Sequence, residues 1–93
     1  MINARLENEE VLYVDDEVIG LGHHDIKHLK ELAAKNRRKR IRLCTHASIK
    51  DNLHEMFIVL GRDSYIIPHK HVGKVESMSI LEGEVDLVFF VPL

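Results

Sequence analysis

Apolar residues change their spacing near the middle of the chain, and this change predicts the order of the secondary structure. A short apolar run at Val11–Val14 predicts a strand, and Val18–Leu21 predicts a second, weaker one. From Asp25, which is placed to cap a helix, to Asn36 the apolar residues follow a helical period. They form one stripe, at Ile26, Leu29, Leu32 and Ala33. One amphipathic helix of about three turns is therefore expected.

After Arg40 the helical period disappears and short β-type runs follow one another. The expected strands are 41–46, 53–60, 65–71, 76–81 and 85–91, with turns at 61–64 and 82–83. Closely spaced strands with tight turns are typical of an antiparallel barrel or sandwich. We expect a mainly β fold with one N-terminal amphipathic helix. Residues 1–93 form a single domain, in which a strand and helix (1–40) precede the β-region (41–93).

The β-region carries the residues best suited to chemistry. Because side chains alternate along a strand, His69 and His71 share a face with Tyr65. An antiparallel neighbour would bring Glu76 opposite the two histidines. Two imidazoles and one carboxylate suit Zn, Fe, Mn, Ni or Co, whereas a cysteine-only zinc site is excluded because Cys44 is the single cysteine. The pattern predicts one divalent transition metal. Without a metal, Glu76 could instead pair with Lys70 or Lys74.

The longer string Pro-His69-Lys-His71-(x)4-Glu76-(x)6-Gly83 resembles the first conserved motif of the cupin superfamily. Further likeness, over about residues 25–90, is to the small WbuC-type cupin-fold metalloproteins of bacterial O-antigen gene clusters. It rests on Arg40-x-Arg42-Leu-Cys-x-His46, on Asp51-x-Leu-His-Glu-Met-Phe and on Ser64-Tyr-Ile-x-Pro-His-Lys-His. The resemblance implies a jelly-roll β-barrel and metal ligation by His69, His71 and Glu76. It implies no particular reaction.

Two features depart from the cupin pattern. The glycine that opens the first motif would fall at Asp63, and the second motif, which usually supplies a third histidine, is not found. Either His46 or His54 is then a candidate additional ligand, with water or a bound anion as the alternative donor. A barrel short of strands would also expose strand edges, so we expect a homodimer formed through them.

Charge and composition narrow the range of partners. The net charge is −2, which gives no general attraction to nucleic acid or to an anionic membrane, and no apolar run is long enough to span a bilayer. The N-terminus lacks the pattern of a secretion signal, so a cytoplasmic protein is expected. The cationic residues 37–42 either cap the helix end or bind an anion, with Arg40 and Arg42 as candidates for the anion site.

These features lead to one functional hypothesis and two alternatives. The chain would be a small metal-binding protein that binds or acts on a sugar derivative or another small anionic, oxygenated ligand, in cell-surface carbohydrate metabolism. Tyr65 would then be a possible proton donor, and the catalytic residues stay unassigned. The alternatives are a ligand-binding protein without catalysis and a homo-oligomer in which the metal has a structural role. Fold alone cannot choose among them.

Overall fold

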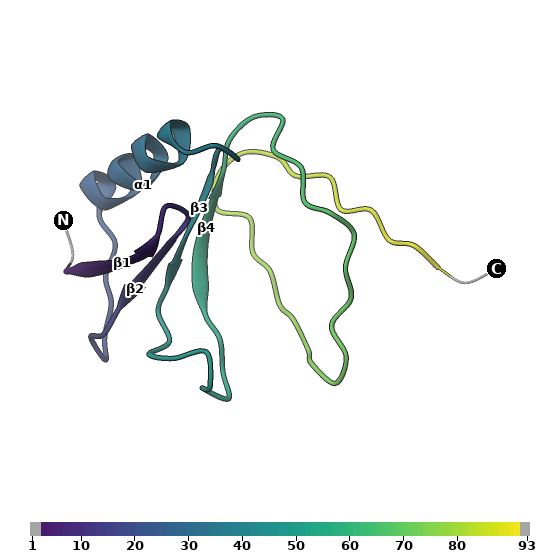
Figure 1. Ribbon diagram of the computed structural model, residues 1–93, viewed down its shortest axis with the longest axis horizontal. Coiled ribbons are helices and arrows are strands. Elements are labelled where there is room, and N and C mark those ends of the chain that lie inside the picture. Colours follow the sequence, from purple (N-terminus) through teal and green to yellow (C-terminus); the bar gives the residue numbers. More distant parts are fainter. Residues whose placement is uncertain (1–2, 92–93) are drawn as a thin grey trace.

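The computed structural model describes residues 3–91, in which four strands and one helix occupy the first two thirds of the chain (Figure 1). In chain order these are β1 (Ala4–Asn8), β2 (Val11–Val14), α1 (His23–Lys35), β3 (Arg40–Cys44) and β4 (Met56–Leu60). The fold is thus mainly β with one helix, as expected. None of the described residues belongs to a helix with the length and apolar character needed to cross a bilayer.

The strands form one open, mixed sheet in the order β1-β2-β3-β4. The β1–β2 and β3–β4 pairs are antiparallel, whereas β2 and β3 are parallel. The expectation of a purely antiparallel sheet was therefore wrong. The parallel pairing of β2 and β3 is explained by α1, which lies between them in the chain. A helix that connects two neighbouring strands returns the chain to the end where the first strand began, so the second strand runs in the same direction. The described part of the sheet is not closed into a barrel.

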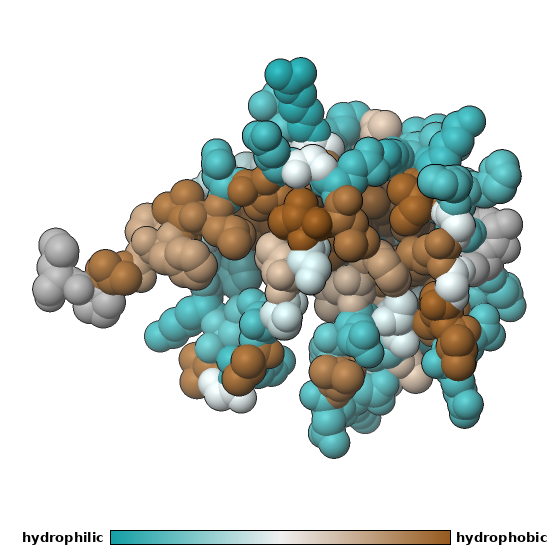
Figure 2. Space-filling model, turned by 180° about the vertical axis from the view of Figure 1, so that it is seen from behind, coloured by the Kyte–Doolittle hydropathy of each residue, from teal (hydrophilic) through white to brown (hydrophobic). Residues whose placement is uncertain are grey.

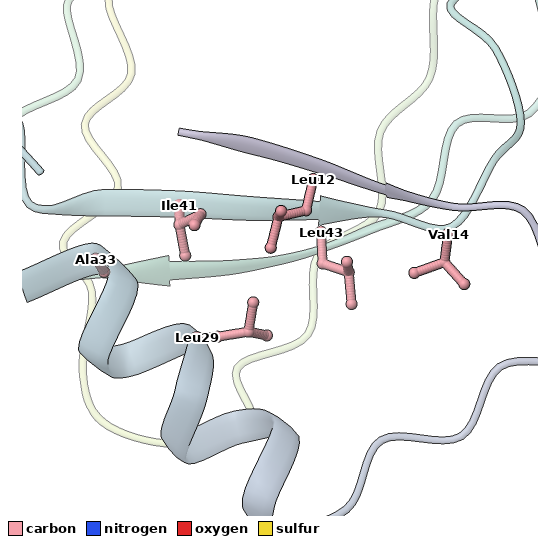
Figure 3. Packing of buried hydrophobic residues seen from close by; sticks show 6 residues of the cluster. All are labelled: Leu12, Val14, Leu29, Ala33, Ile41 and Leu43. Atoms are coloured by element: carbon pink, nitrogen blue, oxygen red, sulfur yellow. The ribbon is translucent and has the colours of Figure 1, made fainter. Parts of the chain in front are cut away.

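The hydrophobic core lies between α1 and one face of the sheet (Figure 3). Leu29 and Ala33 of the expected apolar stripe are buried, and Leu32 packs against the same cluster. The facing sheet residues are almost fully buried, at Leu12, Val14, Ile41 and Leu43. Burial of each such aliphatic side chain contributes about 1.5–3 kcal/mol, so this small cluster is the main source of stability for the sheet and helix.

Cys44 is buried, with 1% of its surface exposed. Burial raises the pKa of its thiol, although the charge of Arg42 and a hydrogen bond with Tyr13 act in the opposite direction. A thiol with a raised pKa is a poor nucleophile at neutral pH, because the thiolate is the reactive form. Cys44 is therefore a small apolar packing residue.

The helix begins earlier than its sequence predicts. Gly22 is the N-cap and Asp25 is the third helical residue, so the assignment of Asp25 as N-cap was wrong. The Gly22 amide donates a hydrogen bond of 2.9 Å to the Asp25 carboxylate, which stabilises the first turn from inside the helix. The C-terminal end is as expected, since Asn36 is the C-cap. The sequence prediction did not include a carboxylate at the third helical position that accepts a hydrogen bond from the N-cap amide.

Several expected strands are absent from the described residues. The segment 18–21 is irregular, although Ile19 and Leu21 pack against the core. The segments 65–71, 76–81 and 85–91 are neither strand nor helix and are exposed. A β-strand needs a neighbour to receive its backbone hydrogen bonds, and alternating side chains alone cannot supply one. The turns at 61–64 and 82–83 are confirmed; Ser64 donates its amide to Gly61, and Gly83 has φ of +86°.

Candidate functional site

His69, His71 and Glu76 lie together on the exposed part of the chain that follows β4. Nε2 of His71 is 3.1 Å from Oε1 of Glu76, and the rings of His69 and His71 meet edge to face with centroids 4.9 Å apart. The chain bends between the two segments at residues 72–73, where Gly73 has φ of +69°. Glycine adopts this conformation without the steric cost of a side chain. The bend thus sets Glu76 beside His71.

A hydrogen bond fixes the ring of His69. Its Nδ1 donates to the carbonyl oxygen of Ile67 over 3.0 Å. A carbonyl can only accept, so Nδ1 carries the proton and the neutral imidazole has its lone pair on Nε2. Metal-binding histidines commonly have their second nitrogen held in this way. His69 therefore presents one nitrogen in the form that ligates a metal.

The three side chains do not yet form a complete coordination shell. Within residues 3–91, no three His, Cys, Asp or Glu side chains are already arranged around a common point that could hold a metal ion. His71 and Glu76 are close enough to share an ion, while His69 touches His71 by its ring edge. Metal binding would require rotation of side chains, and exposed side chains change rotamer on a picosecond to nanosecond timescale.

His46 and His54 form a separate pair after β3. Their rings are stacked, with centroids 4.2 Å apart and planes 7° from parallel, and Tyr13 meets His46 edge-on. His46 is buried, and its Nδ1 lies within hydrogen-bonding distance of the backbone of Glu55. The aromatic contacts of these two histidines are with each other and with Tyr13. The structure thus places the two candidate additional ligands against the sheet and not beside His69 and His71.

Arg40 is engaged in an ion-pair network centred on Glu10. The Glu10 carboxylate accepts hydrogen bonds from Nε and a terminal nitrogen of Arg38, at 2.8 and 2.7 Å, and from Nε of Arg40 at 3.0 Å. These guanidinium groups, Arg38 first, lower the pKa of Glu10 from 4.5 to about 2. Arg40 is thus already partly neutralised, whereas Arg42 is exposed and forms no ion pair with residues 3–91.

This network predicts a loss of stability in acid. A carboxylate whose pKa is lowered by folding stabilises the protein above its unfolded pKa, and this contribution disappears as the pH falls from about 4.5 to about 2. The Arg38 side chain is 57% exposed, so solvent screens part of the attraction. We expect Glu10→Gln to lower the free energy of unfolding by about 1 kcal/mol at pH 6, measured by urea denaturation.

The matched control for that substitution is Glu17→Gln, which removes the same charge from an exposed loop. Its unfolding curve should follow the wild type over the whole pH range. The difference between the wild type and Glu10→Gln should shrink toward zero near pH 2. A difference that stays constant with pH would show that the carboxylate charge is not its source.

Tyr65 lies in a different environment from the histidines. It lines a cavity of about 280 Å³ together with residues 37–39 and 62–64. His69, His71 and Glu76 do not line this cavity. The alternation that placed Tyr65 on the face of His69 assumes a regular strand, and residues 65–71 do not form one. Arg62, which the sequence presents only as a turn residue, lines the same cavity.

Together, these features define a small, mainly β domain: within the described residues one helix covers one face of the sheet, and the segment with His69, His71 and Glu76 is exposed. The chain belongs to the family described as a domain of unknown function, DUF6016, which matches residues 21–91. The match includes α1, β3, β4 and the segment with His69, His71 and Glu76, and it leaves out β1 and β2. No curated protein and no solved structure matches the chain.

Proposed function

We propose that this protein is a small cupin-like metalloprotein that binds one divalent transition metal through His69, His71 and Glu76. The observation that carries the proposal is the 3.1 Å approach of the His71 imidazole to the Glu76 carboxylate. Two ligand atoms about 2.0–2.2 Å from one ion are about 2.8–3.1 Å apart in octahedral geometry and about 3.3–3.6 Å apart in tetrahedral geometry. The donor pair is therefore already spaced as two ligands of one ion would be.

The donor chemistry also fits a transition metal. Neutral imidazole and carboxylate are borderline to hard donors, which favour Zn, Fe, Mn, Ni or Co over soft Cu(I). The His69 hydrogen bond to Ile67 leaves the Nε2 lone pair of His69 available. Three protein ligands leave at least one position for water, substrate or a further side chain, and His46 or His54 would have to leave their stack beside Tyr13 to supply it. The choice between these last donors decides whether the site is open or closed.

An open site would support binding of a small oxygenated molecule, such as a sugar derivative or another anionic ligand in carbohydrate metabolism. The bound metal would act as a Lewis acid toward an oxygen of that ligand. Tyr65 stays the proton donor suggested by the sequence, but it lines the cavity beside residues 37–39 and would have to move to reach a metal at His69 and His71. Whether the ligand is converted or only bound depends on this open position, and a closed site would leave a ligand-binding or structural role.

The direct test is the metal content of protein purified without added metal. Elemental analysis should find about one transition metal ion per chain. Acidification should release the ion, because protons compete with it for the imidazole nitrogens. Protein that neither contains a transition metal nor binds Zn, Fe, Mn, Ni or Co on titration would refute the proposal.

A second candidate function, a homo-oligomer, is favoured by the amount of exposed surface. The chain of 10.8 kDa exposes 8361 Å², whereas a folded monomer of this mass exposes about 5,500 Å². Its radius of gyration is 14.2 Å, against about 12.3 Å for a compact chain of this length. The excess area, about 2,800 Å², is larger than the roughly 1,200–2,000 Å² buried in a typical stable complex.

The segment 65–91, which we call the C-terminal arm, is exposed along its whole length and carries most of the exposed large apolar side chains. Exposed large side chains follow one another along it, among them Met78, Leu81, Leu87, Phe89 and Phe90. Figure 2 shows a brown band that runs from the end of this arm across the middle of one face. We propose that arm segments pair with the free edge of β4 in a second copy, and that such pairing completes a jelly-roll barrel.

A further inference from the structure

Two turns meet beside the carboxyl end of α1 and form the sides of an open cavity lined by residues 37–39 and 62–65, most of which are exposed. The first turn connects α1 to β3, and the second follows β4. Two hydrogen bonds join them: the backbone amide of Gly61 donates to the carbonyl of Lys39 at 2.6 Å, and the side-chain hydroxyl of Ser64 donates to the carbonyl of Arg38 at 3.3 Å. The cavity is thus formed by two segments that are linked to each other.

The geometry of both turns is tightly constrained. Lys39 and Asp63 have φ of +56° and +65°, which non-glycine residues seldom adopt. A Cβ atom on Gly61 would lie 2.8 Å from the carbonyl oxygen of Lys39, so glycine is required for the approach. Unusual backbone conformations persist only where the surrounding structure holds them, and they concentrate at ligand sites.

Positive charge is concentrated at this cavity although the whole chain carries −2. Four cationic residues line it, Arg37, Arg38, Lys39 and Arg62, against the single carboxylate of Asp63. Arg38 is paired with Glu10, and Nζ of Lys39 donates to the Ala34 carbonyl at the helix end. Arg37 and Arg62 form no ion pair with residues 3–91. Two guanidinium groups are therefore available to a ligand.

We propose that this cavity binds the phosphate group of a small phosphorylated molecule. Arginine presents a planar set of donors that matches phosphate oxygens in pairs, and Arg37 and Arg62 approach the cavity from different turns. Tyr65 adds a phenol that can donate to a third oxygen. The volume of about 280 Å³ is below the roughly 300–1,000 Å³ of pockets that bury a whole ligand, so this open cavity suits a single phosphate group of a larger molecule.

A small molecule fits these features better than a nucleic acid. Single-stranded nucleic acid is bound along grooves in which successive bases stack on aromatic side chains. Tyr65 is the one aromatic residue at the cavity. The site is also independent of the proposed metal, because His69, His71 and Glu76 do not line it. Phosphate binding should therefore persist after the metal has been removed.

The test uses the full chain treated with a chelator and dialysed, so that a phosphate cannot bind through a metal. Pyrophosphate is titrated by calorimetry, with inorganic phosphate, citrate and a single-stranded oligonucleotide as comparison ligands. We expect saturable binding of one pyrophosphate per chain, weakened at least about tenfold in Arg62→Gln and in Arg37→Gln. Lys50→Gln, which removes one positive charge from an exposed loop away from the cavity, should bind as the wild type does.

Each other outcome overturns the proposal in a definable way. An equal loss in Lys50→Gln would show general attraction to net charge, and equal affinity for citrate would show a site without preference for phosphate. Oligonucleotide affinity that grows with length would assign the surface to nucleic acid. Circular dichroism of each variant separates lost binding from lost fold, and Arg37 and Arg62 are both exposed residues whose removal should leave the spectrum unchanged.

Discussion

Replacing His71 by alanine is expected to weaken metal binding at least about 100-fold, because a direct ligand is lost. His71 contacts both other members of the proposed site, His69 through its ring and Glu76 through Nε2. Without His71, the two remaining donors, His69 and Glu76, lose the residue that both of them contact. Affinity is measured by competition with a chromophoric chelator, for each of the metals that the wild type binds.

The matched control is His24→Ala, which removes an exposed histidine from α1. It should retain the affinity of the wild type, whereas an unchanged affinity in His71→Ala would end the metal hypothesis. His46→Ala and His54→Ala then distinguish the two forms of the site. A loss comparable to that of His71→Ala would identify a further protein ligand and a closed site. No loss in either variant leaves water or a bound anion as the remaining donor.

Self-association should be the second large effect. We expect the wild type to be a dimer at micromolar concentration, measured by analytical ultracentrifugation over a wide concentration range. The double substitution Leu87→Asp, Phe89→Asp places two charges on alternate positions of the C-terminal arm, which would share one face of a strand. Burial of unpaired charges in an apolar interface is strongly unfavourable, so the dissociation constant should rise at least about 100-fold.

Val18→Asp is the control for that experiment, since Val18 is an exposed apolar residue outside the arm, with 89% of its surface accessible. It should associate like the wild type. A monodisperse monomer across the concentration range would refute the proposed dimer, and dissociation by Val18→Asp alone would place the interface elsewhere. The variant His71→Ala should remain dimeric, because the arm is proposed to pair through its apolar strand face and not through the metal. This result would separate self-association from metal binding.

The local parts of the fold could be predicted from the sequence. The helix and the strands β2 and β3 are determined mainly by residues that are close in the chain. The helical spacing of Leu29 and Ala33 and the apolar runs of β2 and β3 are therefore visible without the structure. The parallel pairing of β2 with β3 could not be predicted, because it depends on the path of the chain through α1. β1 was missed because Ala4–Asn8 contains mainly polar residues, and its pairing with β2 decides its structure.

The same distinction applies to the candidate sites. His69, His71 and Glu76 are separated by seven residues or fewer, so one bend brings them together and the spacing alone indicates them. Arg40 was a candidate either for capping the helix end or for binding an anion, yet its partner Glu10 lies 30 residues away and nothing local indicates that pairing. The basic cavity was predicted only in part, since residues 37–39 belong to the cationic run whereas Arg62 was assigned only to a turn. Arg62 reaches residues 37–39 only because Gly61 permits the close approach of the second turn.

The parallel junction between β2 and β3 has a consequence for how the domain folds. β1 with β2 and β3 with β4 are hairpins, whose strands are near neighbours in the chain. The junction between the hairpins requires closure of the chain from Val14 to Arg40, and non-local contacts of this kind limit folding rates. Leu29 contacts the core on which both hairpins converge. Docking of α1 and joining of the two hairpins should therefore occur in one cooperative step, with each hairpin marginal in isolation.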